Sequence, residues 1–254
     1  MVVGLDKFAE HFAGHRDGYV LIGGAAAWLV LDEAGLETRA TKDLDIVLCV
    51  EVLDAAFVKA FWAFVQAGGY ELQEKSTGEK IFYRFRKPAV EGYPVMLELF
   101  SRQPDGLVLG DDSHLTPIPV GQEVPSLSAI LLNDDYYAFL HAHKREIEGV
   151  PVVSEECLIL LKASAWLDLT RRKADGDNIG GRDINKHRND VLRLYRLLSP
   201  DLRIELPETI RDDLDAFLRE VTEEINTHLL TQLGVSDVSP ADVIGTIRSV
   251  YGVP

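Results

Sequence analysis

The chain has 254 residues, of which 46% are hydrophobic and 26% charged, and its formal net charge is −15 at pH 7. This composition is that of an ordinary globular protein, with enough residues for one large domain or two smaller ones. The acidic charge argues against broad, nonspecific nucleic-acid binding, because polyphosphate is attracted to basic surfaces.

Membrane proteins and disulfide-rich secreted proteins are also disfavoured. No apolar run approaches the roughly 18 residues of a membrane span, and the first residues lack the basic start and long apolar core of a signal peptide. The two cysteines, Cys49 and Cys157, each lie in an apolar run, so we expect no disulfide framework. We therefore expect a cytoplasmic protein with no membrane partner.

The first half of the chain mixes helical and strand-like patterns. Apolar residues at helical spacing predict three helices, the second and third closed by glycines, at 6–15, 25–35 and 53–69. Short apolar or β-branched runs predict strands at 18–24, 44–50, 70–75, 80–87 and 93–101. Residues 101–125 are rich in Pro, Gly and Asp, which is typical of a loop or a connecting hairpin.

The second half of the chain has the patterns of helices, predicted at 154–172, 182–198, 209–233 and 240–252. Ser154 is the predicted N-cap of the first, because two glutamates follow it. Apolar residues from Leu214 to Leu229 form one stripe and predict a single long amphipathic helix. We expect an α+β fold, with a mixed sheet and flanking helices in residues 1–125 and a helical domain in residues 126–254.

Three carboxylates are the first candidates for a functional site. Alternation along a strand sends Asp43 and Asp45 to the same face, roughly 7 Å apart, where they repel each other unless a cation lies between them. Glu98 is flanked by apolar residues, so its unpaired charge would be costly to bury. Each acid alone is better explained as a turn, cap or surface group. A divalent cation such as Mg²⁺, shared by all three, would resolve both problems.

A glycine pair stands ahead of these acids. Gly23 and Gly24 predict a strand-to-helix turn, and their missing side chains would also let a phosphate approach the backbone N–H groups at the start of the helix. With this pair, the run "GGAAAWLVLDEAGLETRATKDLDIVL" resembles the signature of the polymerase-β-type nucleotidyltransferase superfamily. More narrowly, "RATKDLDI" is similar to the abortive-infection nucleotidyltransferase toxins of the AbiEii/AbiGii type, and "EECLILLKASAWLDL" and "KHRNDVLRL" resemble later motifs of that family.

The resemblance covers about residues 18 to 198 and implies a role for each matching residue. The acids that would hold Mg²⁺ or Mn²⁺ are Asp43, Asp45 and Glu98. The residues that would contact the nucleoside triphosphate are Gly23, Gly24, Ala25, Arg39, Thr41 and Lys42. In the helical half, Lys162 would be a phosphate-binding cation, and Asp190 would orient the groups around it.

One position departs from the family pattern. The residue after the glycines is usually Ser or Thr, and here it is Ala25, which removes a hydroxyl donor worth roughly 0.5–1.5 kcal/mol. Weak triphosphate binding, an altered donor or a feeble enzyme are all compatible with this change. Lys162 also has a structural alternative as a lysine whose stem lies along an apolar helix face. His141 and His143 are predicted to be solvated helix residues, because no cluster completes a zinc site around them.

The resemblance implies two-metal transfer of a nucleoside monophosphate from an NTP to an acceptor hydroxyl. Residues 162–196 hold nine Lys or Arg against five Asp, so this segment is either a solvated helix surface or a limited tRNA-binding face. A tRNA-modifying toxin with a cognate antitoxin is one expected function. A small-molecule transferase acting on a cationic aminoglycoside is the second, and a degenerate nucleotide-binding module is the third.

Overall fold

The structure is a computed structural model that describes residues 2–74, 80–103, 115–118 and 127–254. The chain divides into two compact units. The first comprises Met1–Leu29 and Arg39–Val153, and the second comprises Val30–Thr38 and Ser154–Pro254. The boundary predicted between residues 125 and 126 lies outside the described residues, and the first unit continues past that point to Val153 because the strands after it still belong to the sheet.

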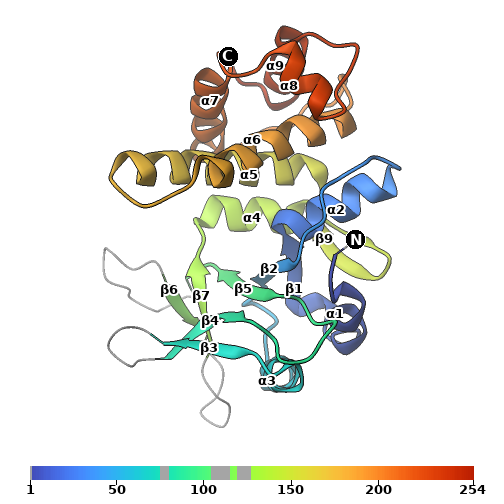
Figure 1. Ribbon diagram of the computed structural model, residues 1–254, viewed down its shortest axis with the longest axis vertical. Helices are drawn as coiled ribbons and strands as arrows, with labels where there is room; N and C mark the ends of the chain where they lie inside the picture. Colours follow the sequence, from blue (N-terminus) through green and yellow to red (C-terminus); the bar gives the residue numbers. More distant parts are fainter. Residues whose placement is uncertain (1, 75–79, 104–114, 119–126) are drawn as a thin grey trace. The chain divides into compact units, whose positions relative to one another are not determined.

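The first unit is built on one mixed sheet (Figure 1). Its described strands are β1 (Tyr19–Ile22), β2 (Asp43–Leu48), β3 (Glu71–Glu74), β4 (Lys80–Arg86), β5 (Met96–Ser101), β6 (Leu115–Ile118), β7 (Leu127–Leu131), β8 (Lys144–Ile147) and β9 (Val150–Val153). They follow the order β3-β4-β5-β2-β1-β9-β8, with β7 paired to β5 and β6. β2 runs parallel to β5 and antiparallel to β1, which makes the sheet mixed as the α+β prediction requires.

The helices of this unit are α1 (Leu5–His11), α2 (Gly23–Glu33), α3 (Ala55–Gly68) and α4 (Asp134–Ala142), with a 3₁₀ turn η1 at Arg16–Gly18. The last residues of α2 group with the second unit. Asp54 caps α3 by accepting a hydrogen bond from the backbone N–H of Phe57, and α3 ends at Gly69 with a φ of +64°. Residues 101–125 were predicted to form a loop or a connecting hairpin. In the described part of this segment, strand β6 pairs antiparallel with β7, which agrees with a hairpin.

Aromatic residues form the core on one face of this sheet. Phe61 of α3 lies 5.4 Å from Phe85 of β4 between ring centroids, and Phe8 of α1 packs edge-on against Tyr19 of β1. Along β2 the burial alternates, because Leu44 and Ile46 are fully buried. On the opposite face of β2, Asp43 and Asp45 are half-buried.

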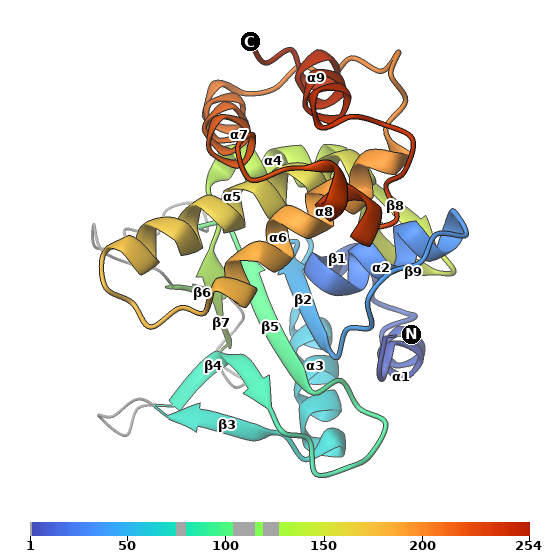
Figure 2. The ribbon, with the colours of Figure 1, turned by 45° about the horizontal axis from the view of Figure 1, so that its top comes forward.

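The second unit is helical and consists of α5 (Glu155–Ala174), α6 (Gly181–Leu194), η2 (Tyr195–Leu197), α7 (Glu208–Val221), α8 (Thr227–Gln232) and α9 (Pro240–Tyr251) (Figure 2). Ser154 caps α5 as predicted, accepting a hydrogen bond from the Cys157 N–H. In the core, Trp166 of α5 packs edge-on against Phe217 of α7, with 5.5 Å between ring centroids.

The prediction of a single long helix at 209–233 is wrong. α7 ends at Val221, and a new helix, α8, begins at Thr227. The break has a local cause, because the side chain of Asn226 accepts a hydrogen bond from the Leu229 N–H and so caps a new helix. The apolar stripe continues across the break, since Val221, Ile225 and Leu230 are all buried, and this continuity misled the sequence prediction.

In the part of the chain that the structure describes, no helix has the length and apolar character needed to span a membrane.

Candidate active site

A glycine pair forms the turn between β1 and α2. Gly23 has a φ of +67°, a left-handed conformation that residues with side chains rarely adopt. A Cβ atom at Gly23 would lie 1.8 Å from Oδ2 of Asp45, and a Cβ atom at Gly24 would lie 2.9 Å from Oγ1 of Thr41. Gly23 is therefore needed for the turn to approach Asp45 of β2, and Gly24 leaves room for the hydroxyl of Thr41.

The turn places the start of α2 beside a carboxylate. α2 begins at Gly23, and its first backbone N–H groups have no partner within the helix. Such a helix N-terminus favours an anion. Asp45 already brings a negative charge to this point, so a phosphate could approach only if a cation neutralised part of that charge. This local electrostatic requirement links the glycine turn to a metal ion.

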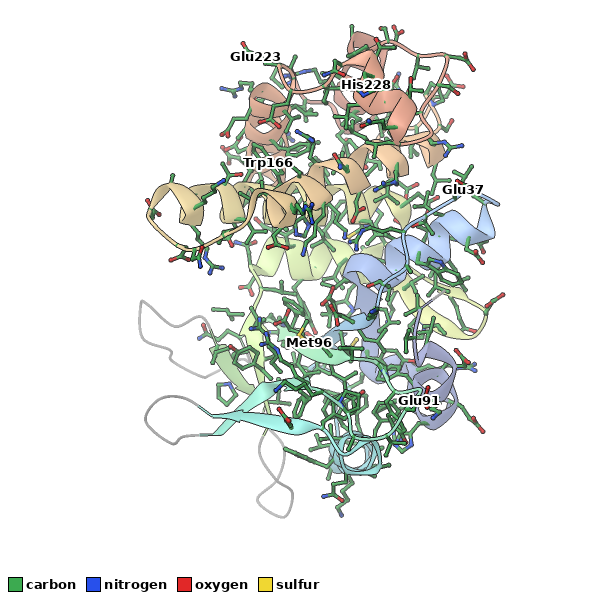
Figure 3. All side chains as sticks on the ribbon, viewed as in Figure 1. Glu37, Glu91, Met96, Trp166, Glu223 and His228 are labelled. Carbon is green, nitrogen blue, oxygen red and sulfur yellow. The ribbon has the colours of Figure 1, made fainter. Side chains whose placement is uncertain are left out.

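The register of the sheet brings the three predicted acids to one face. Asp43 and Asp45 alternate with the buried Leu44 on β2. β5 lies parallel to β2, and in that pair Asp45 is the partner of Glu98. Met96 of β5, labelled in Figure 3, is the partner of Asp43. Glu98 therefore lies beside Asp45, although 53 residues separate them in the chain.

Arg84 is the neighbour of Glu98 that the sequence analysis missed. It stands opposite Glu98 in the antiparallel pair of β4 and β5. Its Nε donates a hydrogen bond to Oε1 of Glu98, and its Nη2 forms an ion pair with the same oxygen. The Glu98 side chain is 12% exposed and that of Arg84 27%. The alternation of Tyr83, Arg84 and Phe85 was the only signal for this residue in the sequence.

The residues fit a divalent cation in part. Within the described part of the chain, no group of three or more His, Cys, Asp or Glu side chains is arranged to hold a metal ion. Asp43 and Asp45 nevertheless offer carboxylate oxygens on one face, and Mg²⁺ is commonly held by one or two carboxylates together with substrate phosphates. Glu98 could join them as a third ligand if it left Arg84.

The other predicted nucleotide-binding residues lie around the same turn. Thr41 is buried, and a Cβ at Gly24 would also lie 3.7 Å from Nη2 of Arg39. Lys42 and Arg39 are exposed and carry the positive charge nearest to the acids along the chain. Ala25 is fully buried, so its methyl group packs in the core and only its backbone could face a ligand.

The two predicted residues of the helical half form a buried ion pair. Nζ of Lys162 lies 2.9 Å from Oδ2 of Asp190, and their side chains are only 5% and 6% exposed. Arg193 adds a contact of 3.3 Å to the other carboxylate oxygen of Asp190. The structure thus brings Lys162 and Asp190 together, joining α5 to α6 within the second unit. The buried ion pair gives Lys162 a structural role, but not the predicted one of a lysine that lies along an apolar helix face, because its ammonium group is withdrawn from solvent.

Ion pairs also reduce the positive surface of residues 162–196. Five of its nine cations have carboxylate partners: Lys162, Arg172, Lys186, Arg188 and Arg193. Arg188 is buried and reaches Glu224, which lies outside the segment. Arg171, Lys173 and Arg182 are exposed at the end of α5 and the start of α6. The segment therefore presents a smaller basic surface than its composition indicates.

A separate cavity of about 880 Å³ lies at the far end of β2, past Leu48. Sγ of Cys49 and Nδ1 of His141 meet at 3.8 Å in its wall. Burial raises the pKa of the Cys49 thiol to about 12, and burial together with nearby Lys144 lowers the pKa of His141. His141 and His143 were predicted to be solvated, but both are half-buried and pack against Tyr137 and Phe139.

Glu51 belongs to the wall of the same cavity. Tyr137 donates a hydrogen bond of 2.6 Å to it, and Nε of Arg102 donates one of 2.8 Å. Burial raises the pKa of Glu51, but these two hydrogen bonds, a hydrogen bond from its own backbone and the charge of Arg102 together outweigh burial and hold the pKa below its ordinary value. The network joins the loop after β2 to α4 and is a structural feature of the first unit.

No model of a protein family matches the chain, and no curated protein matches its sequence. Among solved structures, one similar fold is a protein from H. pylori provisionally assigned as a nucleotidyltransferase, with a TM-score of 0.38, 12% identity, and coverage of 97% of this chain and 88% of that chain. Another is JHP933 from Helicobacter pylori, with a TM-score of 0.38, 14% identity, and coverage of 97% and 85%. Likeness at this level demonstrates no shared activity, so any function must be argued from the residues of this chain.

Proposed function

We propose that this protein is a metal-dependent nucleotidyltransferase that transfers a nucleoside monophosphate from an NTP to an acceptor hydroxyl. The observation that supports it most is the contact between the Gly23 turn and the carboxylate of Asp45, which allows no side chain at Gly23. A helix N-terminus able to receive phosphate and a carboxylate able to bind a cation thus meet at one point. The further acids Asp43 and Glu98 lie on the same face.

In the proposed reaction the acceptor oxygen attacks the α-phosphorus of the NTP. A new phosphorus–oxygen bond forms, the bond to the β-phosphate oxygen breaks, pyrophosphate leaves, and the hydroxyl proton passes to solvent. Asp43, Asp45 and Glu98 would hold Mg²⁺ or Mn²⁺, which would neutralise phosphate charge and lower the pKa of the attacking hydroxyl. The backbone of Gly23 and Gly24 would hold the triphosphate, and Arg39 and Lys42 would add positive charge.

Two classes of acceptor are each supported by a different observation. Transfer to tRNA, as a toxin with a cognate antitoxin, is supported by the sequence resemblance and by the exposed cations Arg171, Lys173 and Arg182. Transfer to a cationic small molecule of the aminoglycoside type is supported by the net charge of −15. Lys162, Arg188 and Arg193 also favour this second acceptor, because ion pairs hold these largely buried cations away from RNA phosphates.

Label transfer tests the proposal. The protein is incubated with each α-labelled NTP, Mg²⁺ and either bulk tRNA or an aminoglycoside, and the labelled acceptor is separated. We expect label on one acceptor, lost in Asp45→Asn and kept in Asp32→Asn, a change at an exposed carboxylate of α2. RNA transfer should weaken steeply with salt. Tight nucleotide binding without transfer to any acceptor would instead support the binding-module alternative.

A further inference from the structure

Three side chains form a row across adjacent strands of the first unit. Arg84 of β4 is paired with Glu98 of β5, and Glu98 is paired with Asp45 of β2. Partners in register point to the same face of a sheet. The guanidinium therefore stands on the acidic face, with Glu98 between it and Asp45.

The contact between Arg84 and Glu98 involves one carboxylate oxygen. Nε and Nη2 of Arg84 both meet Oε1 of Glu98. Because both side chains are largely withdrawn from solvent, the attraction is screened less than in an exposed ion pair. The same cation repels any second positive charge that approaches the acids.

We propose that Arg84 is a positioning residue that competes with a divalent metal for the carboxylate of Glu98. This inference rests on the proposed function. Without nucleotide, Glu98 stays with Arg84, and the two charges of a metal ion are disfavoured beside the guanidinium. A triphosphate bound together with a metal would offset the guanidinium charge, and Glu98 could then leave Arg84 and serve as a metal ligand. Metal and nucleotide binding are therefore coupled, each strengthening the other.

Binding of Mn²⁺ alone tests this competition, measured by electron paramagnetic resonance of the free ion, without nucleotide and then with a non-hydrolysable NTP analogue. We expect Arg84→Met to bind Mn²⁺ alone about tenfold more tightly than wild type, within the usual range of coupling between sites. The matched control is Arg86→Met, an exposed arginine two residues along the same strand, which should bind as wild type does. Arg84→Gln, which removes the charge but keeps hydrogen-bonding groups, should behave as Arg84→Met does and serves if that variant fails to fold.

A double-mutant cycle identifies Glu98 as the route of the effect. In a Glu98→Gln background, Arg84→Met should raise the Mn²⁺ affinity clearly less than it does with Glu98 present, because only the direct repulsion between the guanidinium and the ion remains. If Arg84→Met binds Mn²⁺ no more tightly than wild type, while wild type binds Mn²⁺ with the nucleotide analogue in an Asp45-dependent manner, the competition is disproved and the proposed function stands. If neither wild type nor Arg84→Met binds Mn²⁺ under either condition, both proposals fail.

Discussion

The carboxylate of Asp45 lies against the Cα atom of Gly23, so closely that a Cβ there would be 1.8 Å from Oδ2. The two residues come from different elements, since Gly23 begins α2 and Asp45 lies within β2. Their contact is possible because β1, which precedes Gly23, pairs with β2 and places Ile22 opposite Asp45. The antiparallel pairing of two short strands thus builds the centre of the candidate active site.

Replacement of Gly23 by alanine should damage both stability and the site. Gly35→Ala is the matched control, because Gly35 has a φ of +68° but no atom within 4 Å of its would-be Cβ. The control should cost about 1–2 kcal/mol for the left-handed backbone. Gly23→Ala should cost about 1–3 kcal/mol more, because its methyl group collides with Asp45. Urea unfolding measures the difference, and equal costs would show that the glycine turn does not constrain the acid.

Loss of Asp190 should destabilise the second unit. Asp190→Asn leaves the buried charge of Lys162 without its carboxylate, so the free energy of unfolding should fall by about 3–5 kcal/mol. Asp183→Asn, which breaks an exposed pair of 3.9 Å in the same helix, should cost less than about 1 kcal/mol. Similar losses in the two variants would argue against a structural ion pair.

Lys162→Met should leave nucleotide affinity unchanged if the pair is structural, whereas a large loss of nucleotide affinity would support the phosphate-binding role.

The local features of the fold could be read from the sequence because their causes are local. Ser154 caps α5 through a neighbour three residues away, and Gly69 ends α3 through its own backbone. The Arg84–Glu98 pair could not be predicted, because it depends on β4 pairing with β5 in one register. The break before α8 was missed because a buried apolar stripe crosses it.

The face shared by Asp43 and Asp45 follows from strand alternation alone. That Glu98 lies beside Asp45 requires the parallel pairing of β2 and β5, for which the sequence has no local signal. The partner of Lys162 depends on the packing of α5 against α6 and had no local signal.

Stability should decrease as the pH falls because of His141. Burial and the nearby cations Lys144 and Arg102 lower its pKa in the folded protein, and Glu51 only partly opposes them. The unfolded chain therefore binds a proton near pH 6.5, before the folded protein does. The contribution of neutral His141 to the free energy of unfolding is complete above about pH 6.5. It is lost as the pH falls through the lower pKa of His141 in the folded protein. Melting curves between pH 7.5 and 5 should show a smaller decline for His141→Gln than for wild type, and parallel declines would contradict the assignment.

Both thiols should be unreactive in the folded protein. Cys49 and Cys157 are buried and unpaired by disulfide, and burial raises the pKa of each. Because the thiolate is the reactive form, Ellman's reagent should detect neither thiol at pH 8 under native conditions and both in guanidinium chloride. Rapid reaction of one thiol in the native protein would contradict this prediction. If the reaction is lost in Cys49→Ser, the cavity wall around Cys49 opens.

The central claim is that the Gly23 turn and the acids of β2 form one metal–triphosphate site. Thermal melting with each NTP and Mg²⁺ tests it most directly, on wild type and on the double variant Asp43→Asn/Asp45→Asn. A ligand at about 100 times its Kd stabilises the folded state by roughly 2.7 kcal/mol, which should raise the Tm of a chain of this size by several degrees. We predict a Mg²⁺-dependent rise in wild type that the double variant lacks. No rise with any NTP, or an equal rise in the double variant, would contradict the claim.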